Sequence, residues 1–209
     1  MAATRAAEHL TTEGQPPQVE LSPEAGAILL RLARSVIEAT ASGRLGEADV
    51  ASLVPPDPPA AIVAPAAAFV TLFEAGELRG CVGCLNFELP LWASVASAAA
   101  SAATRDPRFE PVAEREVPFL SITVSVLGPL LPLSDPSAFR PGVDGLTVEC
   151  GYLRGLLLPE VATEHGWGFE EMLDATAWKA GLSGDPRHEP QTRLFVFRTA
   201  RVSEANAPG

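Results

Sequence analysis

The sequence predicts an α+β fold in which a mainly antiparallel sheet is flanked by helices. An apolar stripe of helical spacing comes first, and short strand-like segments follow it as hairpins. Helical and strand segments then occur in a mixed order, whereas strict alternation would predict a doubly wound parallel sheet. The 209 residues suit one domain, or one domain built from two lobes, with enough apolar material for a core.

Charge and composition limit the functions open to the chain. Its 26 acidic and 15 basic residues give a net charge of -11, which repels phosphate. A general nucleic-acid surface is therefore disfavoured, and any anion site must be local. No stretch approaches the ~18 apolar residues of a membrane span. Residues 1–20 lack the apolar run of a signal peptide, so we expect a disordered leader on a cytoplasmic protein.

The first predicted helix begins after Ser22, which has the character of an N-cap and is followed by Pro23 at the first helical position. Apolar residues then recur at three- and four-residue spacing for about five turns. Residues 53–65 contain five prolines, so we expect a surface connector that is neither a helix nor a central strand.

Residues 68–73 and 78–85 predict a β-hairpin, whose second arm is weakened by Gly80 and Gly83. A helix rich in alanine and serine follows from Leu91 and is stopped by Asp106 and Pro107, because the residue before a proline is pushed out of the helical region.

The strongest strand pattern covers residues 119–127, where apolar residues alternate with serine and threonine. Residues 146–150 and 152–158 predict a second hairpin that turns near Gly151. We then expect short helices over residues 159–164 and 169–180, with Gly181 as the C-cap of the second, and a closing strand over residues 194–202.

Cys81 and Cys84 form a CxxC pattern, which is typical of zinc sites and of dithiol redox proteins. A structural zinc site needs four ligands, and the other candidates, Cys150, His165 and His188, are not paired at ligand spacing. A redox pair usually begins a helix, whereas this one lies in a predicted strand that would point the two thiols to opposite faces. We favour two small buried thiols over either site and predict no metal.

Arg79 and Cys81 share strand parity, so we expect their side chains to lie on the same face. An arginine beside a thiol stabilises the thiolate, and the neighbouring glycines would leave backbone N–H groups open to a ligand. Arg105 and Arg108, around the helix stop, could present guanidinium groups to the same anion. Alternatively, Arg105 or Arg108 pairs with carboxylates such as Glu110 or Glu114.

His165 lies between a predicted helix and a Gly-Trp-Gly turn, where a capping role competes with that of an acid–base group. Lys179, the single lysine, lies near a helix C-terminus, where any cation is favoured. The sequence has no GxxxxGK[ST], no GxGxxG after a strand, no HExxH, no GxSxG and no CxxxCxxC pattern. We therefore predict no cofactor.

The segment LRGCVG, residues 78–83, resembles the LRGCIG motif of the AMMECR-type family, called AmmeMemoRadiSam system protein A in bacteria and archaea. Three further parts match in order: DPRF at residues 106–109, RPGVDGL at 140–146, and GLLLP at 155–159 running on to GW at 166–167 and KAGL at 179–182. The resemblance spans about residues 21–203, which we take as one domain with a larger and a smaller lobe, followed by a tail over residues 204–209.

The resemblance implies a two-lobed protein with the motif near the cleft between the lobes, and an activity that is not established. It also implies partnership with a Memo-like protein and a radical S-adenosylmethionine enzyme. Two positions depart from the family pattern: Cys84 stands where Thr or Ser is common, and Ala177 stands where Cys is frequent. The absence of a cysteine at position 177 disfavours a mechanism that joins two cysteines, whereas Cys81 is retained.

Our leading hypothesis is an accessory protein or enzyme that binds an anionic ligand in the cleft, with Cys81 as nucleophile and His165 as acid–base group. The ligand-binding candidates are Arg79, Gly80, Gly83, Arg105, Arg108 and Lys179. The alternatives are a non-catalytic adaptor and a nucleic-acid-binding protein, and the acidic balance of the chain disfavours the second of these.

Overall fold

The computed structural model describes residues 16–44, 50–205 and 207. Their helices and strands, in chain order, are α1 (Pro23–Ala41), η1 (Val50–Leu53), α2 (Ala60–Val63), β1 (Ala68–Glu74), β2 (Glu77–Cys84), α3 (Leu91–Thr104), η2 (Glu114–Phe119), β3 (Leu120–Leu127), β4 (Leu131–Pro132), η3 (Pro136–Ala138), β5 (Gly145–Cys150), β6 (Leu153–Leu157), α4 (Pro159–His165), α5 (Phe169–Ala180), η4 (Pro186–His188), β7 (Thr192–Phe197) and β8 (Thr199–Ser203), with η marking 3-10 helices.

These elements form two compact units. The larger unit comprises residues 19–127 and the chain from Ala200 onwards, and the smaller unit comprises residues 128–199 with residues 16–18. Each has its own sheet, and the mixed α+β class predicted from the sequence is confirmed.

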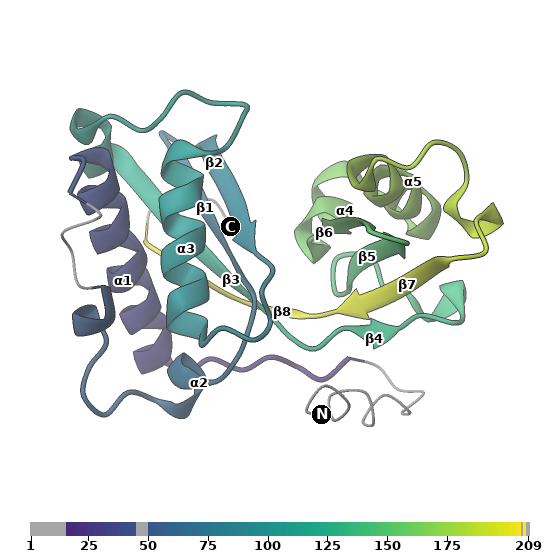
Figure 1. Cartoon of the computed structure of the whole chain (residues 1–209), viewed down its shortest axis with the longest axis horizontal. Coiled ribbons are helices and arrows are strands. Elements are labelled where there is room, and N and C mark those ends of the chain that lie inside the picture. Colours follow the sequence, from purple (N-terminus) through teal and green to yellow (C-terminus); the bar gives the residue numbers. More distant parts are fainter. Residues whose placement is uncertain (1–15, 45–49, 206, 208–209) are drawn as a thin grey trace. The chain divides into compact units, whose positions relative to one another are not determined.

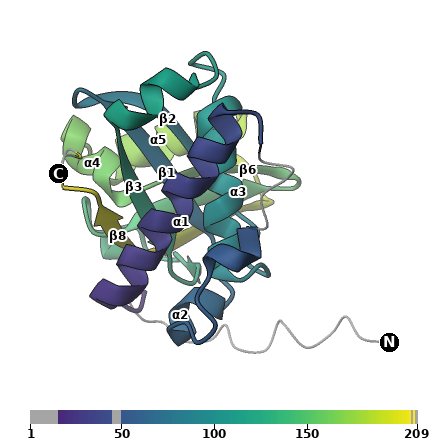
Figure 2. The same ribbon diagram turned by 90° about the vertical axis from the view of Figure 1, so that its left-hand side faces the viewer.

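In the larger unit the strand order is β2-β1-β3-β8, and β1 pairs antiparallel with both β2 and β3. Helices α1 and α3 pack together on one face of this sheet (Figures 1 and 2). As predicted, α1 begins after Ser22, whose Oγ accepts the backbone N–H of Ala25 at 3.1 Å, and Pro23 is its first residue. The other face of the sheet carries the serine and threonine side chains of β3.

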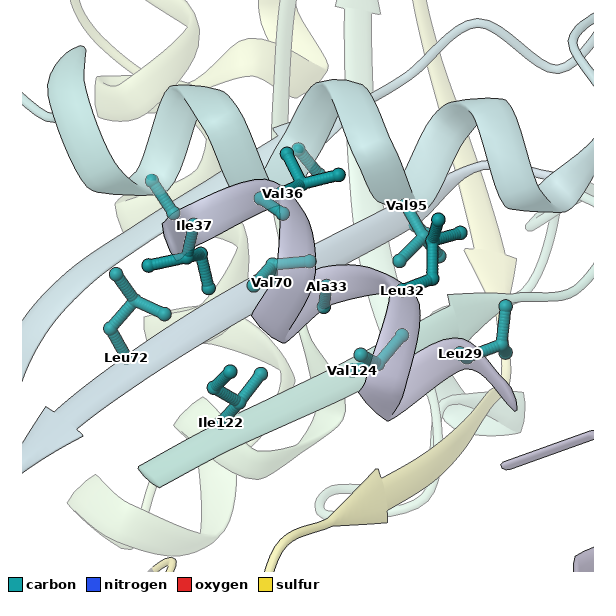
Figure 3. Close-up of a cluster of buried hydrophobic side chains, with 14 of the residues drawn as sticks. Leu29, Leu32, Ala33, Val36, Ile37, Val70, Leu72, Val95, Ile122 and Val124 are labelled. Carbon is teal, nitrogen blue, oxygen red and sulfur yellow. The ribbon is translucent and has the colours of Figure 1, made fainter. Parts of the chain in front are cut away.

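The core of the larger unit lies between the two helices and the sheet. Figure 3 shows side chains from α1, α3, β1 and β3 meeting there, among them Leu32, Val36, Val70, Val95 and Ile122. All five are almost fully buried. The apolar stripe of α1 and the alternation of β3 therefore serve the same core, as their periodicities predicted.

In the smaller unit the strand order is β4-β7-β5-β6 with antiparallel pairing, and α5 packs on β5 and β6. A second core gathers around Leu146, Val148, Met172 and Leu173. Helix α5 ends where the sequence predicted, because Gly181 adopts the left-handed conformation of a C-cap, with φ 84°.

Two predictions about individual elements were wrong. The closing strand expected over residues 194–202 is two strands, β7 in the sheet of the smaller unit and β8 in that of the larger. Residues 194–202 contain no glycine, proline, asparagine or aspartate that would mark a break, so the sequence does not reveal the change of sheet. The proline-rich connector also contains one helical turn, α2, which is possible because Pro59 precedes the turn and its missing N–H is not needed there.

Most of the expected leader lies outside the described residues. Near its end, Val19 packs against the core of the larger unit, and Gln18 accepts a hydrogen bond from Arg198 Nη1 at 3.0 Å. Glu204, where we expected a tail to begin, binds the guanidinium of Arg34 through both carboxylate oxygens. None of the helices in the described parts of the chain is long and apolar enough to cross a membrane.

Candidate functional site

The motif at residues 78–83 lies on β2, an edge strand of the larger unit. The pairing of β2 with β1 is irregular here: Leu78 lies opposite Phe73 and Gly80 opposite Leu72, so Arg79 is one residue too many. Such a bulge changes the direction of side chains relative to simple alternation. The segment that follows α3 then contacts both Arg79 and Cys81, through the bonds described below.

Cys81 is half-buried and lies opposite Thr71 of β1. The Thr71 hydroxyl donates a hydrogen bond to Cys81 Sγ at 3.2 Å. On the outer side of the strand, the backbone N–H of Cys81 donates to Asp106 Oδ2 at 2.8 Å. Cys81 is thus bound at its sulfur by a hydroxyl of the neighbouring strand and at its backbone N–H by a carboxylate from a later segment.

Asp106, expected from the sequence only as part of a helix stop, is the residue that organises this region. Its side chain is 3 % exposed, and it accepts from Cys81 N, from Arg108 N at 3.1 Å, from Arg108 Nε at 2.9 Å and from Arg108 Nη2 at 2.7 Å. The Arg108 side chain, followed by these backbone donors, lowers the pKa of Asp106 to about 2, although burial opposes the shift. Asp106 is therefore a carboxylate at neutral pH.

Arg108 is held by Asp106 and remains accessible. Its side chain is 53 % exposed and lies 5.4 Å from the centre of the Phe109 ring. Nε and Nη2 bind Asp106, while Nη1 makes no hydrogen bond to any residue that the structure describes. The hydrogen bond to Asp106 is the largest cause of a raised Arg108 pKa, and the charge of Cys81 also raises it. A guanidinium and a Cys81 thiolate would therefore stabilise each other.

The expected partners of Arg108, Glu110 or Glu114, are not the ones it binds. A signal for the actual arrangement was present in the sequence, because an aspartate side chain often accepts the backbone N–H two residues further on, and Asp106 does so with Arg108.

Arg79 mainly fixes the segment that follows α3, between Glu110 and Glu116, against the edge of β2. Its Nε and Nη2 bind the two carboxylate oxygens of Glu116 at 3.0 and 3.2 Å, and Nη1 binds the carbonyl oxygen of Glu110 at 3.0 Å. The Arg79 hydrogen bond also lowers the pKa of Glu116, as does the N–H of Ala113. All three guanidinium nitrogens of Arg79 therefore already bind protein atoms.

Packing accounts for both glycines of the motif. A Cβ on Gly80 would lie 2.5 Å from the carbonyl oxygen of Ala102 in α3, and a Cβ on Gly83 would lie 2.5 Å from the Phe69 ring. The strand can approach the helix and the ring because these side chains are missing. A role of the two glycines in ligand binding stays a prediction.

The remaining candidates divide between the two units. Arg105 follows α3 in the larger unit, with an exposed side chain that makes no hydrogen bond or ion pair within the described residues. His165 and Lys179 belong to the smaller unit, where both are exposed. The His165 ring stacks on Trp167 with 4.4 Å between ring centres, so one face of the imidazole is covered by the indole.

Arg79 and residues 105–116 together carry no net charge, although the whole chain carries -11. They contain four arginines, at positions 79, 105, 108 and 115, and four carboxylates, at positions 106, 110, 114 and 116. Two depressions, of about 700 and 780 Å³, lie elsewhere and do not include Cys81. Within the described residues, no three cysteine, histidine, aspartate or glutamate side chains gather as metal ligands. The region combines the half-buried Cys81 with several accessible guanidinium groups, of which that of Arg108 is fixed by Asp106.

Comparison with known proteins shows that most of the chain is similar to archaeal proteins. A protein of Methanothermobacter thermautotrophicus is 44% identical over 184 residues, covering 85% of this chain and 93% of its own length. Protein MJ0810 of Methanocaldococcus jannaschii is 35% identical, covering 90% and 94%. The crystal structure of the uncharacterized protein PH0010 from Pyrococcus horikoshii matches with a TM-score of 0.77 and 36% identity, over 88% of this chain and 94% of that one. The AMMECR1 family model matches residues 30–202.

Proposed function

Since this chain belongs to the AMMECR1 family, whose motif residues fall on the edge strand just described, we propose that Cys81 and Arg108 form a binding site for a small anionic ligand, with the Cys81 thiolate as nucleophile. One observation carries the proposal. A single oxygen, Asp106 Oδ2, accepts both the backbone N–H of Cys81 at 2.8 Å and Nη2 of Arg108 at 2.7 Å. The backbone of the residue that carries the thiol and the guanidinium of Arg108 are thereby bound to one buried carboxylate.

Each group in this arrangement has a separate task. Asp106 positions the other two and does not meet the ligand, because its side chain is buried. Arg108 offers Nη1 and the exposed side of its guanidinium to an anionic group, a carboxylate or a phosphate. The Thr71 hydroxyl, 3.2 Å from the sulfur, stabilises negative charge there by hydrogen bonding.

The reaction class that these groups support is addition of the thiolate to a carbonyl carbon. The S–C bond forms, the π electrons of the C=O bond pass to its oxygen, and that oxygen takes a proton from solvent to become a hydroxyl group, while the anionic group of the ligand stays on Arg108. No oxidant, reductant or leaving group is required. The acid–base role of His165, a residue of the smaller unit, stays a prediction from the sequence.

Alkylation by a matched pair of reagents tests the nucleophile and the anion site together. Iodoacetate is anionic and iodoacetamide is neutral, and mass spectrometry reports the rate at each cysteine. Cys84 and Cys150 are also free and half-buried, so they serve as internal controls. We expect Cys81 to react fastest and to have the highest ratio of iodoacetate to iodoacetamide rates.

Two arginine variants complete the experiment. Arg108→Ala should lower the Cys81 ratio by about three-fold, the effect of one partly screened charge. Arg105→Ala removes an exposed arginine three residues away and should leave the ratio unchanged within about 1.5-fold. The proposal fails if Cys81 reacts no faster than Cys84 and Cys150, or if the two arginine variants behave alike.

The family resemblance implies two partners, a Memo-like protein and a radical S-adenosylmethionine enzyme. In this proposal one of them supplies the ligand and the other receives it. Mass spectrometry of the protein purified together with them should reveal an adduct on Cys81. A stable complex without any adduct, retained in Cys81→Ala, would favour the adaptor hypothesis instead.

A further inference from the structure

A second candidate surface lies in the smaller unit, along the outer side of α5. A depression of about 780 Å³ runs from this helix to the loop that follows Gly181, and all of its lining residues belong to this unit. Trp178, Asp174 and Asp185 line it together with Arg187 and Glu170. The proposed thiol site is in the other unit, so this surface is independent of it.

Trp178 is the unusual residue of the depression. It is 81 % exposed and makes no ring contact with any residue that the structure describes. The core of the smaller unit does not use it, because Met172, Leu173 and Ala177 supply the buried side of α5. An exposed indole of this size is a common feature of binding surfaces, where it contributes a large rigid area at low entropic cost.

The charge around Trp178 is negative. Asp174 is four residues before it, and therefore lies on the same face of α5 one turn away. Asp174 has no ion pair among the described residues, whereas Glu170 and Asp185 share the single guanidinium of Arg187, at 2.9 Å each. Three carboxylates thus line the depression with one arginine, and Lys179 is not among the lining residues.

We propose that this depression binds an arginine-containing peptide segment of a partner protein. The guanidinium of such a segment would lie over the Trp178 ring, whose face attracts cations, and would pair with the Asp174 carboxylate. The depression continues from α5 to Asp185 and can take several residues of an extended chain. A nucleic acid is the wrong occupant, because its phosphates would meet uncompensated carboxylates.

The test uses the full chain and a labelled, capped ten-residue peptide of alternating arginine and glycine, with binding followed by fluorescence anisotropy. Matched peptides carry glutamine or glutamate in place of arginine. We expect saturable binding of the arginine peptide that weakens with salt, and no binding of the glutamate peptide. Trp178→Ala and Asp174→Asn should each weaken binding by about three-fold.

Tyr152 provides the control. It is the other strongly exposed aromatic of this unit, at 96 %, but it lies at the turn between β5 and β6 and does not line the depression. Tyr152→Ala should leave the affinity unchanged within about 1.5-fold. All three side chains are at the surface, so the variants should fold, and circular dichroism verifies this.

Several results would overturn the proposal. They are the absence of saturable binding up to about 1 mM peptide, equal binding of the glutamine peptide, an equal loss in Tyr152→Ala and Trp178→Ala, and Trp178-dependent binding of a single-stranded RNA of the same length in place of the peptide. Cys81 alkylation is unaffected by any of these outcomes, so the two proposals stand or fall separately.

Discussion

Asp106→Asn tests the arrangement of the thiol site most directly. The carboxylate accepts four hydrogen bonds, three of them from Arg108 and one from the backbone of Cys81. Asparagine has almost the same shape, and its amide oxygen can keep one or two of these bonds. The substitution therefore removes the charge while leaving the space filled.

The lowered pKa of Asp106 sets the size of the effect. A shift from 3.8 to about 2 corresponds to about 2 kcal/mol of stabilisation by the ionised form. We expect Asp106→Asn to lower the free energy of unfolding of the larger unit by that amount at pH 7. With a urea dependence of about 2 kcal/mol per molar, the unfolding midpoint should fall by about 1 M.

The pH dependence has a definite sign. Because the pKa is lower in the folded than in the unfolded state, the stabilisation is fully present above about pH 4 and is lost as the pH falls towards 2. The difference between wild type and Asp106→Asn should therefore be constant from pH 7 to 5. Near pH 3 it should have shrunk to about half.

Urea denaturation at these pH values, with hydrogen exchange read on peptides of the larger unit, measures the difference. Asp57→Asn is the matched control, because Asp57 is an exposed aspartate of the same unit, and its replacement should cost less than about 0.5 kcal/mol. A loss below about 0.5 kcal/mol for Asp106→Asn, or a loss of unchanged size at pH 3, would refute the reasoning.

Substitutions at three further positions test packing, capping and an ion pair in the larger unit, each by urea denaturation. Gly80→Ala should cost about 1–3 kcal/mol, because its Cβ would lie 2.5 Å from the Ala102 carbonyl oxygen, and a neutral result would contradict that contact. Ser22→Ala should cost about 1 kcal/mol through loss of the N-cap, and Ser22→Asn should restore most of it. Arg34→Met should cost about 2 kcal/mol, because the Arg34 guanidinium binds both carboxylate oxygens of Glu204 and two carbonyl oxygens; equal stability of the variant and the wild type would exclude this role.

Local patterns predicted most of the fold. Ser22 and Pro23 predicted the start of α1, and Gly181 predicted the end of α5, because helix caps depend on a few neighbouring residues. The alternation in β3 likewise reported a strand with one apolar face. Each of these signals lies within the element that it predicts.

The candidate site was harder to predict because its bonds join distant segments. Asp106 reaches the backbone of Cys81, 25 residues earlier in the chain, and no periodicity encodes that contact. The irregular pairing at Arg79 depends on the register with β1, which the residues of β2 alone do not show. Gly80 is likewise required because a carbonyl oxygen of α3 lies close to it. The sequence shows the glycine but does not show which atom approaches it.

The neighbouring positions of β3 and β8 have a consequence for synthesis on the ribosome. These strands lie side by side in one sheet, yet the whole of residues 128–199 is made between them. While the smaller unit emerges and folds, the sheet of the larger unit therefore lacks β8, and one edge of β3 is unpaired. Strand β8 and Glu204, the partner of Arg34, are synthesised only after the smaller unit. A chain that stops before residue 199 would leave this edge of β3 open to aggregation, so β8 protects the larger unit from association through that edge.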